Sequence, residues 1–477
     1  MSRREWLAAA VAGAAGTLGA RRSGGAAAAP VGHTPHPHRG AGHTPQETAW
    51  DAEVAAAVRR IQAPAFAART FRVTDHGARE GGQADARPGV QRAIDRCAAD
   101  GGGTVLVPDG LWRLDGPLHL RSGVRLHLGD RTTLRFSSDP AHYLPQVFTR
   151  WEGTECFNYS PLVYAYQAVD VGVTGRGTID GNALAGFAAW RTRQQDAQQR
   201  LRRLGTEGAP VHRRVFGDGD FLRPSFVQFV GCRRVLVEGP TFVDAPFWVL
   251  HPVYCDSVTV RGVTVDSRRL NNDGVDPDSS SGVLVERCTF ATGDDAVAIK
   301  SGRDADGWRV ARPTTDVVVR DCEMPAVHNG VCIGSEMSGG VRRVYVERCR
   351  AAHVNGAALY FKANLDRGGA VERVRVRDVT VGEADRCVEF TTAYHGYRGG
   401  TAPPSFADVA LARVHCERAR TAVRAVGVPE APLRAVSFDD VTVAHADTAS
   451  VVRHVRGLAA RGVRVNGQAL ALRQHVD

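Results

Sequence analysis

Long hydrophobic runs are missing from this 477-residue sequence beyond its N-terminus. No later segment approaches the roughly 20 apolar residues that a membrane-spanning helix needs, so we expect no membrane span. The ten cysteines form no Cys-x-x-Cys pair, which predicts that there is no zinc site, and no other motif indicates a metal or a cofactor. The formal charge of +9 is not gathered into basic runs interleaved with aromatic residues, which excludes a nucleic-acid-binding protein.

The N-terminal segment has the order of features found in an export signal. Ser2-Arg3-Arg4 is followed by a run of small apolar residues and then by Ala-rich sequence. This order predicts a twin-arginine export signal over residues 1–30, and hence a periplasmic or extracellular location. Residues 31–66 are predicted to form a linker rich in His, Pro and Gly and then a short helix. Residues 67–477 are predicted to form one domain.

A short alternation of apolar and polar residues recurs along the chain at intervals of roughly 20 to 35 residues, which is typical of a solenoid. Its copies are 235–239, 258–265, 283–288, 317–322, 344–349, 374–379, 409–414 and 436–441. Each copy offers one apolar face, so successive copies must stack to bury a continuous core. Several cysteines recur at one place in the unit, which predicts buried, stacked thiols rather than a disulfide scaffold.

The repeats predict an all-β protein, a single right-handed parallel β-helix. A sandwich or a propeller would need hairpin turns of the Asn-Gly kind between the strands, and such turns are largely absent. A helix with apolar positions Val90, Ala93, Ile94 and Cys97 precedes the first strands. We expect this helix to cap the N-terminal edge of the solenoid, which would otherwise expose unpaired backbone groups.

Ionisable residues recur at about one per turn of this coil. Asp273 is followed by the pair Asp294-Asp295, then by His328 and by Lys362, each about one repeat further on. Because rungs stack about 4.8 Å apart, these groups would form a strip of roughly 15 Å on one face, suited to a linear polymer. Cleavage of a glycosidic bond needs one protonated carboxyl as acid and another as base. The moderate positive charge suits an anionic substrate.

The strip resembles the four motifs of glycoside hydrolase family 28, the polygalacturonases: Asn271-Asn272-Asp273, Gly293-Asp294-Asp295, Val327-His328-Asn329 and Tyr360-Phe361-Lys362. The resemblance runs from about Phe71 to about Val441, and stretches 300–307 and 334–340 resemble the bacterial, exo-acting branch. It implies a pectin-lyase-like solenoid. It also implies an inverting hydrolase that cleaves α-1,4-linked galacturonosyl bonds of pectic polysaccharide or its oligomers.

By this resemblance, Asp294 is the general acid, while Asp273 and Asp295 hold and activate the attacking water. His328 tunes the acid or contacts the sugar, and Lys362 neutralises a uronate carboxylate. The predicted substrate-binding set also contains Tyr360, Asn271, Arg303 and Lys300. An inverting enzyme is expected to keep its acid and base about 6.5–9.5 Å apart. Crowded carboxylates repel, which raises the pKa of one of them.

The sequence departs from the family pattern at several positions. Tyr360 stands where the family has Arg, so a guanidinium that would grip a uronate carboxylate is missing. We expect Arg303, Arg309 or Arg367 to restore that charge. Val327 and Asn329 replace the glycines around the family histidine and narrow the space near the acid. Asp276 and Asp278 are predicted to be turn and scaffold acids.

Two polar segments favour exo action. Residues 300–313 and 191–221 are long enough to build a wall across one end of the cleft. Two other functions stay open: a pectate lyase, which uses calcium and an Arg base for β-elimination, and a non-catalytic carbohydrate-binding β-helix. The sequence leaves the choice among pectic glycans open, and we expect the protein to be a monomer.

Overall fold

The computed structural model describes residues 45–472, of which those from Thr48 onward belong to one compact unit. The predicted export signal at 1–30 and the His-rich linker lie outside the described residues. The described chain is a right-handed parallel β-helix, which confirms the predicted architecture. No helix among residues 45–472 is both long and apolar enough to cross a lipid bilayer.

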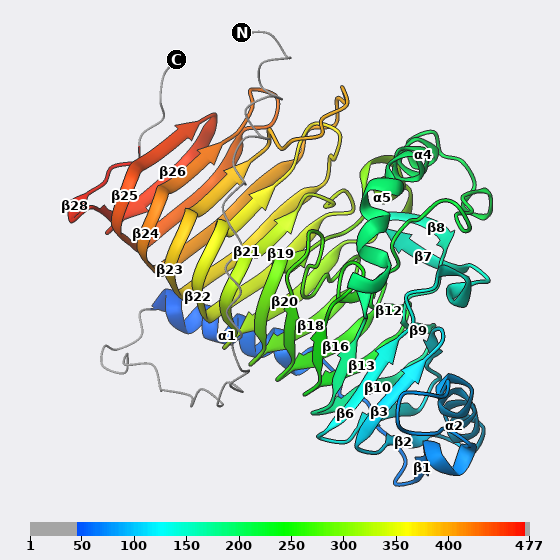
Figure 1. Ribbon diagram of the computed structural model, residues 1–477. Coiled ribbons are helices and arrows are strands. Elements are labelled where there is room, and N and C mark those ends of the chain that lie inside the picture. The colour runs from blue at the N-terminus through cyan, green and yellow to red at the C-terminus, as the bar shows by residue number, and fades with distance from the viewer. Residues whose placement is uncertain (1–44, 473–477) are drawn as a thin grey trace, which may run out of the picture. The chain divides into compact units, whose positions relative to one another are not determined.

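The strands stack in chain order from one end of the solenoid to the other (Figure 1). The first part of the stack is formed by β1 Thr70–Arg72, β2 Gly103–Val107, β3 Gly110–Leu114, β4 Leu118–His119, β5 Val124–Leu128, β6 Thr132–Phe136, β9 Val163–Tyr166, β10 Val169–Gly175, β11 Thr178–Asp180, β12 Val227–Val230, β13 Arg233–Glu238, β14 Thr241–Val243, β15 Leu250–Val253, β16 Asp256–Arg261 and β17 Thr264–Ser267. The second part is formed by β18 Ser281–Glu286, β19 Thr289–Ile299, β20 Thr314–Arg320, β21 Glu323–Gly334, β22 Val341–Lys362, β23 Ala370–Thr391, β24 Ser405–Val426, β25 Leu433–Arg453, β26 Val455–Arg461, β27 Arg464–Val465 and β28 Gln468–Ala469.

Residues at the same place in successive repeats lie directly above one another. Val260 pairs with Val237 on one side and with Val285 on the other, and all three are buried. Such columns bury the apolar face that each repeat offers, which removes that face from water. All ten cysteines are buried and free, and the Cys322 thiol is flanked by those of Cys288 and Cys349. The predicted column of buried thiols is therefore confirmed.

The corners of the rungs are built by charged residues in the left-handed backbone conformation. The φ angles lie between 49° and 55° at Arg287, Asp321, Arg348, Asp378 and Arg413. Residues of opposite charge on neighbouring rungs pair, as in Arg348 Nε–Asp321 Oδ1 at 2.7 Å and Arg413 Nε–Asp378 Oδ1 at 2.6 Å. Parallel rungs therefore turn here without the Asn-Gly pairs of hairpins.

Helix α2, Arg87–Ala99, covers the N-terminal end of the stack (Figure 1). Val90, Ala93, Ile94 and Cys97 are buried and belong to the main core, together with the side chains of β2 and β5. The predicted capping helix is therefore confirmed, because its apolar positions close the open end of the solenoid.

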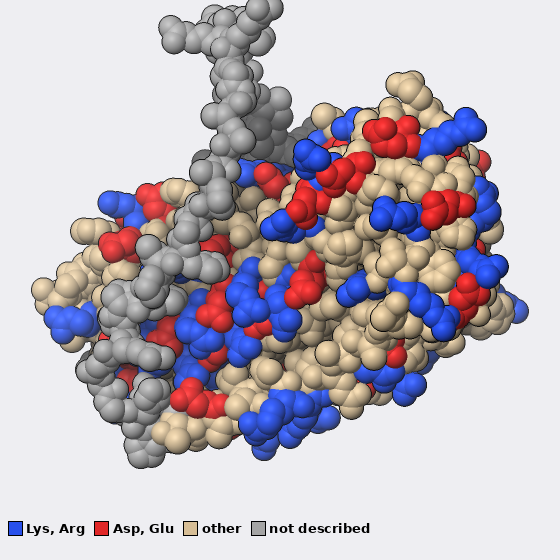
Figure 2. Space-filling view, turned by 90° about the horizontal axis from the view of Figure 1, so that it is seen from below, with Lys and Arg blue, Asp and Glu red and all other residues tan. Residues whose placement is uncertain are grey.

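Helix α1, Pro45–Arg60, is the short helix expected before the solenoid, and it packs against the outside of the strands. Val54 and Ala57 bury apolar side chains against Leu284, Val318 and Tyr345. At its two ends, ion pairs join Arg60 to Asp316 and Asp51 to Arg377, at 2.9 and 2.5 Å. Figure 2 shows basic and acidic side chains interspersed on the underside of the molecule. The charges seen on this face are thus mixed rather than gathered into a basic stripe.

Candidate active site

The segment that carries the first acids forms one rung of the stack, between β15 and the end of β19. Val275 forms parallel bridges with Leu250 and with Val297, and all three side chains belong to the core. Because side chains alternate across a strand, the neighbouring residues Asp276 and Gly274 face the other way. The sequence around Val275 thus turns a run of acids toward the outer face of the solenoid.

A break in strand register places the second pair of acids. The pairing of β19 with β21 is irregular between Thr292 and Asp295, and it resumes where Asp295 lies opposite Asn329. A bulge of this kind re-aims side chains at a point where the ladder is interrupted. Asp294 and Asp295 therefore leave the strict alternation of the strand and meet Asp273.

The three predicted catalytic carboxyls meet closely. One oxygen from each of Asp273, Asp294 and Asp295 lies within 4.8 Å of the other two. Asp273 and Asp295 are buried, and Asp294 is partly exposed. Oxygens this close could also ligate a cation. These distances join the selected oxygens of the three groups and are shorter than the 6.5–9.5 Å carboxyl separation expected of inverting enzymes.

Neighbouring groups drive the pKa values of Asp294 and Asp295 in opposite directions. Burial, followed by the charge of Asp295, raises the pKa of Asp294. Burial also acts to raise the pKa of Asp295, but Lys362, Lys300 and a hydrogen bond from Asn329 outweigh it and lower that pKa. The surroundings thus drive the two pKa values apart, in the sense that an acid beside a base requires.

Lys362 and Asn329 hold Asp295 from two sides. Lys362 Nζ donates to Asp295 Oδ2 at 2.8 Å, and Asn329 Nδ2 donates to Asp295 Oδ1 at 2.8 Å. The backbone N–H of Ala357 donates to Asn329 Oδ1 and so fixes the amide. The role of Asn329 was missed in the sequence, where its only signal is that it replaces a family glycine. Lys362 contacts Asp295 directly, and its predicted contact with a uronate stays a prediction.

Lys300 and Lys362 are the two lysines of the whole chain, and both are buried in this site. Lys300 Nζ lies 3.7 Å from Asp273 Oδ2, 3.5 Å from Asp276 Oδ1 and 3.5 Å from Glu336 Oε2. Burial acts to lower the pKa of Lys300, but these carboxylates raise it well above its usual value. Lys300 is therefore a positive charge held behind the carboxyls rather than a surface lysine.

Asp276 lies inside the cluster of charged groups around Lys300, whereas Asp278 lies beside that cluster. Asp276 is fully buried, neither of its oxygens has a hydrogen-bond partner, and burial raises its pKa well above the usual value. Asp278 forms an ion pair with the buried Arg150 at 2.9 Å, which suits the predicted scaffold role. Asp276 follows the core residue Val275, so alternation along the strand turns it to the opposite face. This spacing is the signal that could have placed Asp276 in the site.

The other predicted residues surround the acid. The backbone N–H of Asn271 donates to Asp294 Oδ2 at 3.1 Å, and its side-chain oxygen accepts from Arg223. His328 is exposed. Its charge lowers the pKa of Asp294, although burial, Asp295 and Lys362 have larger effects on that pKa. The ring of Tyr360 lies 5.0 Å from Lys362 Nζ. The four motif segments are thus brought together around Asp294.

A hairpin closes the side of the site toward the N-terminal rungs. Strands β7, Val147–Trp151, and β8, Thr154–Asn158, lie beside β9 and β12 (Figure 1). Tyr164 donates to the carbonyl of Phe148, and Gln228 donates to that of Arg150. Arg150 also donates to Asp278 and Ser279. This hairpin was not predicted as part of a wall, because its contacts join residues far apart in sequence.

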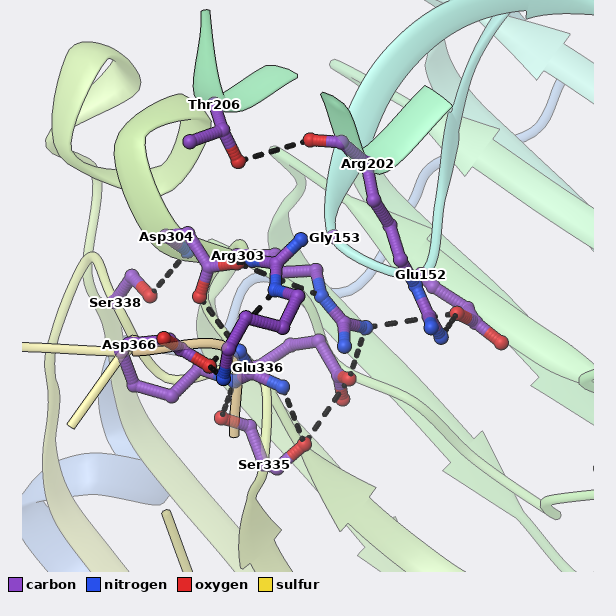
Figure 3. Close-up of polar contacts among 12 residues, drawn as sticks. Glu152, Gly153, Arg202, Thr206, Arg303, Asp304, Ser335, Glu336, Ser338 and Asp366 are labelled. Carbon is purple, nitrogen blue, oxygen red and sulfur yellow. Dashed lines mark hydrogen bonds and ion pairs between the residues drawn. The ribbon is translucent and has the colours of Figure 1, made fainter. Parts of the chain in front are cut away.

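The two predicted wall segments pack against this hairpin. They contain α3, Trp190–Arg193, α4, Gln195–Thr206, and α5, Asp304–Val310. Arg202 of α4 pairs with Glu152 of the hairpin at 2.6 Å, and Glu152 in turn lies 3.5 Å from Arg303. Figure 3 shows Arg303 between Glu152 and Glu336. The hairpin and these helices, here called the wall, form one structure beside the catalytic carboxyls.

The arginines expected to replace the missing guanidinium are already paired with acids. Arg303 is buried and forms an ion pair with Glu336 at 2.9 Å, and Arg367 forms one with Asp304 at 2.6 Å. Arg309 lies 3.0 Å from Asp306 and also contacts Glu155. These side chains hold the wall together. Their predicted contact with substrate stays a prediction, and each would have to leave an acid to make it.

Comparison with known proteins identifies the family. The model of "Glycosyl hydrolases family 28" matches residues 216–461. The crystal structure of an exopolygalacturonase from Thermotoga maritima superposes with a TM-score of 0.85 and 35% sequence identity, covering 88% of this chain and 96% of that one. The chain belongs to glycoside hydrolase family 28. It is accordingly a glycoside hydrolase.

Two sequence relatives extend the comparison of this family 28 hydrolase. A probable polygalacturonase of Vitis vinifera is 26% identical over 363 residues, 73% of this chain and 68% of the relative. An endo-polygalacturonase of Pectobacterium carotovorum subsp. carotovorum is 24% identical over 329 residues, 66% and 73% of the two chains. The family expected from four short motifs is confirmed.

Proposed function

We propose that this family 28 hydrolase cleaves α-1,4-linked galacturonosyl bonds of pectic polysaccharide or its oligomers, removing units from a chain end. The observation that carries the proposal is the pair formed by Asp294, whose pKa is raised, and Asp295, whose pKa is lowered, in contact with Asp273. Family membership and the relatives named polygalacturonase support the substrate class.

The chemistry follows from the contacts of each carboxyl. Asp294 gives its proton to the glycosidic oxygen as the bond from that oxygen to the anomeric carbon breaks. Asp295, held ionised by Lys362 and Asn329, takes a proton from the water that attacks the anomeric carbon, and Asp273 orients this water. The step leaves Asp294 ionised and Asp295 protonated, and exchange of protons with solvent restores the starting state. His328, exposed beside the acid, faces the leaving sugar.

The wall supports exo action. It lies beside β9 and β12, which belong to the rungs before the catalytic carboxyls. A polymer in the cleft can therefore extend only over the later rungs, β22 to β25. We infer that the end of a chain lies against the wall, as in an exo-acting enzyme.

The purified protein should release one short product from polygalacturonate throughout the reaction, while viscosity falls only slowly. Product masses, the anomeric configuration of the first product by NMR, and absorbance of unsaturated uronides should be followed together. A ladder of intermediate oligomers would contradict exo action. Retention of configuration would contradict the direct attack of water on the anomeric carbon, and with it inversion. Unsaturated products that no longer form when a calcium chelator is present would indicate a lyase. Tight binding of polygalacturonate without turnover would indicate a carbohydrate-binding protein.

The rate should have a bell-shaped dependence on pH, with its maximum at acidic pH. The base works only above the pKa of Asp295, which is lowered, and the acid works only below the pKa of Asp294, which is raised. Asn329→Ala removes a hydrogen bond to ionised Asp295, so the pKa of Asp295 should rise and the acidic limb should move to higher pH. The basic limb should stay in place. Profiles of kcat/KM for the two proteins test this, and an unmoved acidic limb would exclude Asp295 as the base.

We also propose export by the twin-arginine route, on the sequence of residues 1–30. The monomeric state expected from the sequence stays a prediction.

A further inference from the structure

The outer face of the solenoid continues past Tyr360 onto the next rungs. Tyr360 lies opposite Glu389, and Glu389 lies opposite Arg424. Val388 and Phe390 on either side of Glu389 are fully buried in the core. Since side chains alternate across a strand, Glu389 and Arg424 face the same side as Tyr360. This is the side on which a polymer stopped by the wall must extend.

Two guanidinium groups converge on Glu389. Arg424 Nη1 lies 2.7 Å from one of its oxygens, and Arg386 Nε lies 2.5 Å from the other. The side chain of Glu389 is 5% exposed, whereas those of Arg386 and Arg424 are 24% and 34% exposed. Glu389 is thus a buried anchor beneath two arginines that reach the surface. Arg386 Nε and Glu389 Oε2 both lack a hydrogen-bond partner, although they are in contact.

The charges around this anchor leave a positive excess. Arg386 and Arg420 also pair with Asp385, at 2.8 and 2.5 Å. Three arginines therefore share two acids. Burial raises the pKa of Glu389, against the pull of Arg386 and Arg424. Arg303 and Arg367, whose side chains are 8% and 2% exposed, are by contrast buried with their acids inside the wall.

The cluster is continuous with the catalytic strip. The pKa of Asp385 is lowered chiefly by Arg420, and the charge of His328 contributes to the same shift. His328 also acts on Asp294. Asp294, His328 and the arginine cluster therefore follow one another along the outer face, in the direction away from the wall.

We propose that Arg386 and Arg424, ordered by Glu389, bind a uronate carboxylate on the leaving-group side of the scissile bond and take the place of the guanidinium missing at Tyr360. This inference rests on the proposed hydrolysis of galacturonosyl bonds. A guanidinium binds a carboxylate in a planar, two-pronged geometry that a tyrosine cannot supply. Arg386 and Arg424 are specificity-determining residues here, since they touch substrate away from the reacting atoms.

The double variant Arg386→Gln/Arg424→Gln should raise KM for trigalacturonate by about tenfold or more and change kcat by less than twofold. Arg413→Gln is the matched control, because Arg413 lies on β24 like Arg424 and pairs with Asp378 at the opposite corner. It should leave both constants unchanged. Adding Tyr360→Arg to the double variant should recover most of the lost affinity, because it restores the guanidinium at the family position.

Binding of trigalacturonate to a variant lacking the acid, Asp294→Asn, measured by calorimetry with and without the two arginine changes, provides a second readout. An unchanged KM and unchanged binding would overturn the inference, as would an equal loss in Arg413→Gln or a fall in kcat alone. If the unmodified protein does not hydrolyse galacturonosyl bonds at all, the proposed function fails first, and the two failures are thereby distinguished.

Discussion

Asp294→Asn should lower kcat by about 10²- to 10⁴-fold, the contribution typical of a positioned general acid. An amide cannot protonate the glycosidic oxygen, but it copies the shape and neutrality of the protonated carboxyl. Asp295 should therefore keep its charge and its contacts with Lys362 and Asn329. Steady-state rates on an oligogalacturonide, with binding measured separately, check the expected loss of turnover without loss of affinity.

The stability of this variant provides a second, independent readout. A carboxyl whose folded-state pKa is raised stabilises fully only below its unfolded pKa, and that contribution is lost as pH rises through the folded value. An asparagine does not titrate, so its contribution to stability does not change with pH. Asp294→Asn should therefore be no less stable than the unmodified protein near neutral pH. Asp378→Asn, at an exposed corner ion pair, is the control and should keep full activity. Full activity in Asp294→Asn itself would remove Asp294 from the role of acid.

Lys362→Met should be the most damaging single change for both rate and stability. It leaves Asp295, which is 1% exposed, without the ammonium group that lies 2.8 Å away. Removal of one partner from a buried ion pair costs about 3–5 kcal/mol. The pKa of Asp295 should rise, so that less of the base is ionised at a given pH and the acidic limb of the rate profile moves upward. The expected fall in kcat on the acidic side is about 10²-fold, within the range for a lost general base.

The pH dependence of unfolding distinguishes this mechanism from simple loss of packing. A carboxyl with a lowered pKa stabilises the fold above its unfolded pKa, and that contribution disappears as pH falls through the folded value. The loss of unfolding free energy in Lys362→Met should therefore become smaller as the pH is lowered. Denaturant unfolding at several pH values measures this loss. Lys362→Arg keeps the charge and should keep the acidic limb near its original place. Arg176→Met breaks an exposed ion pair with Asp130 and should leave both stability and rate nearly unchanged. A deficit independent of pH would contradict the proposed role of the ammonium group.

The positions of the carboxyls were accessible from the sequence because the fold is periodic. A gap of about one repeat between Asp273 and Asp294 places both on one face, whatever the details of the turns. The same periodicity predicts the core columns, and the apolar spacing of 90, 93, 94 and 97 predicts the cap. The motif around Asp294 then predicts the family, which the comparisons confirm.

The pairing of the charged side chains could not be predicted in this way. Lys362 meets a carboxylate 67 positions earlier, and Arg303 meets Glu152 across a separation of 151. Loops outside the repeat carry residues such as Glu152 and Arg150, and loop sequences contain no period that would place them. We therefore predicted that Arg303 and Arg367 could contact substrate, whereas the structure shows each of them bound to an acid.

The sequence by itself determined the solenoid, its N-terminal cap and the meeting of Asp273, Asp294 and Asp295, because stacking of a repeated strand converts spacing along the chain into position on a face. The tertiary structure alone decided in which direction the pKa of each carboxyl is shifted, which cations are already paired with acids and where the wall stands. Those properties depend on burial and on short contacts between distant loops and rungs. A pKa responds to them within a few ångströms.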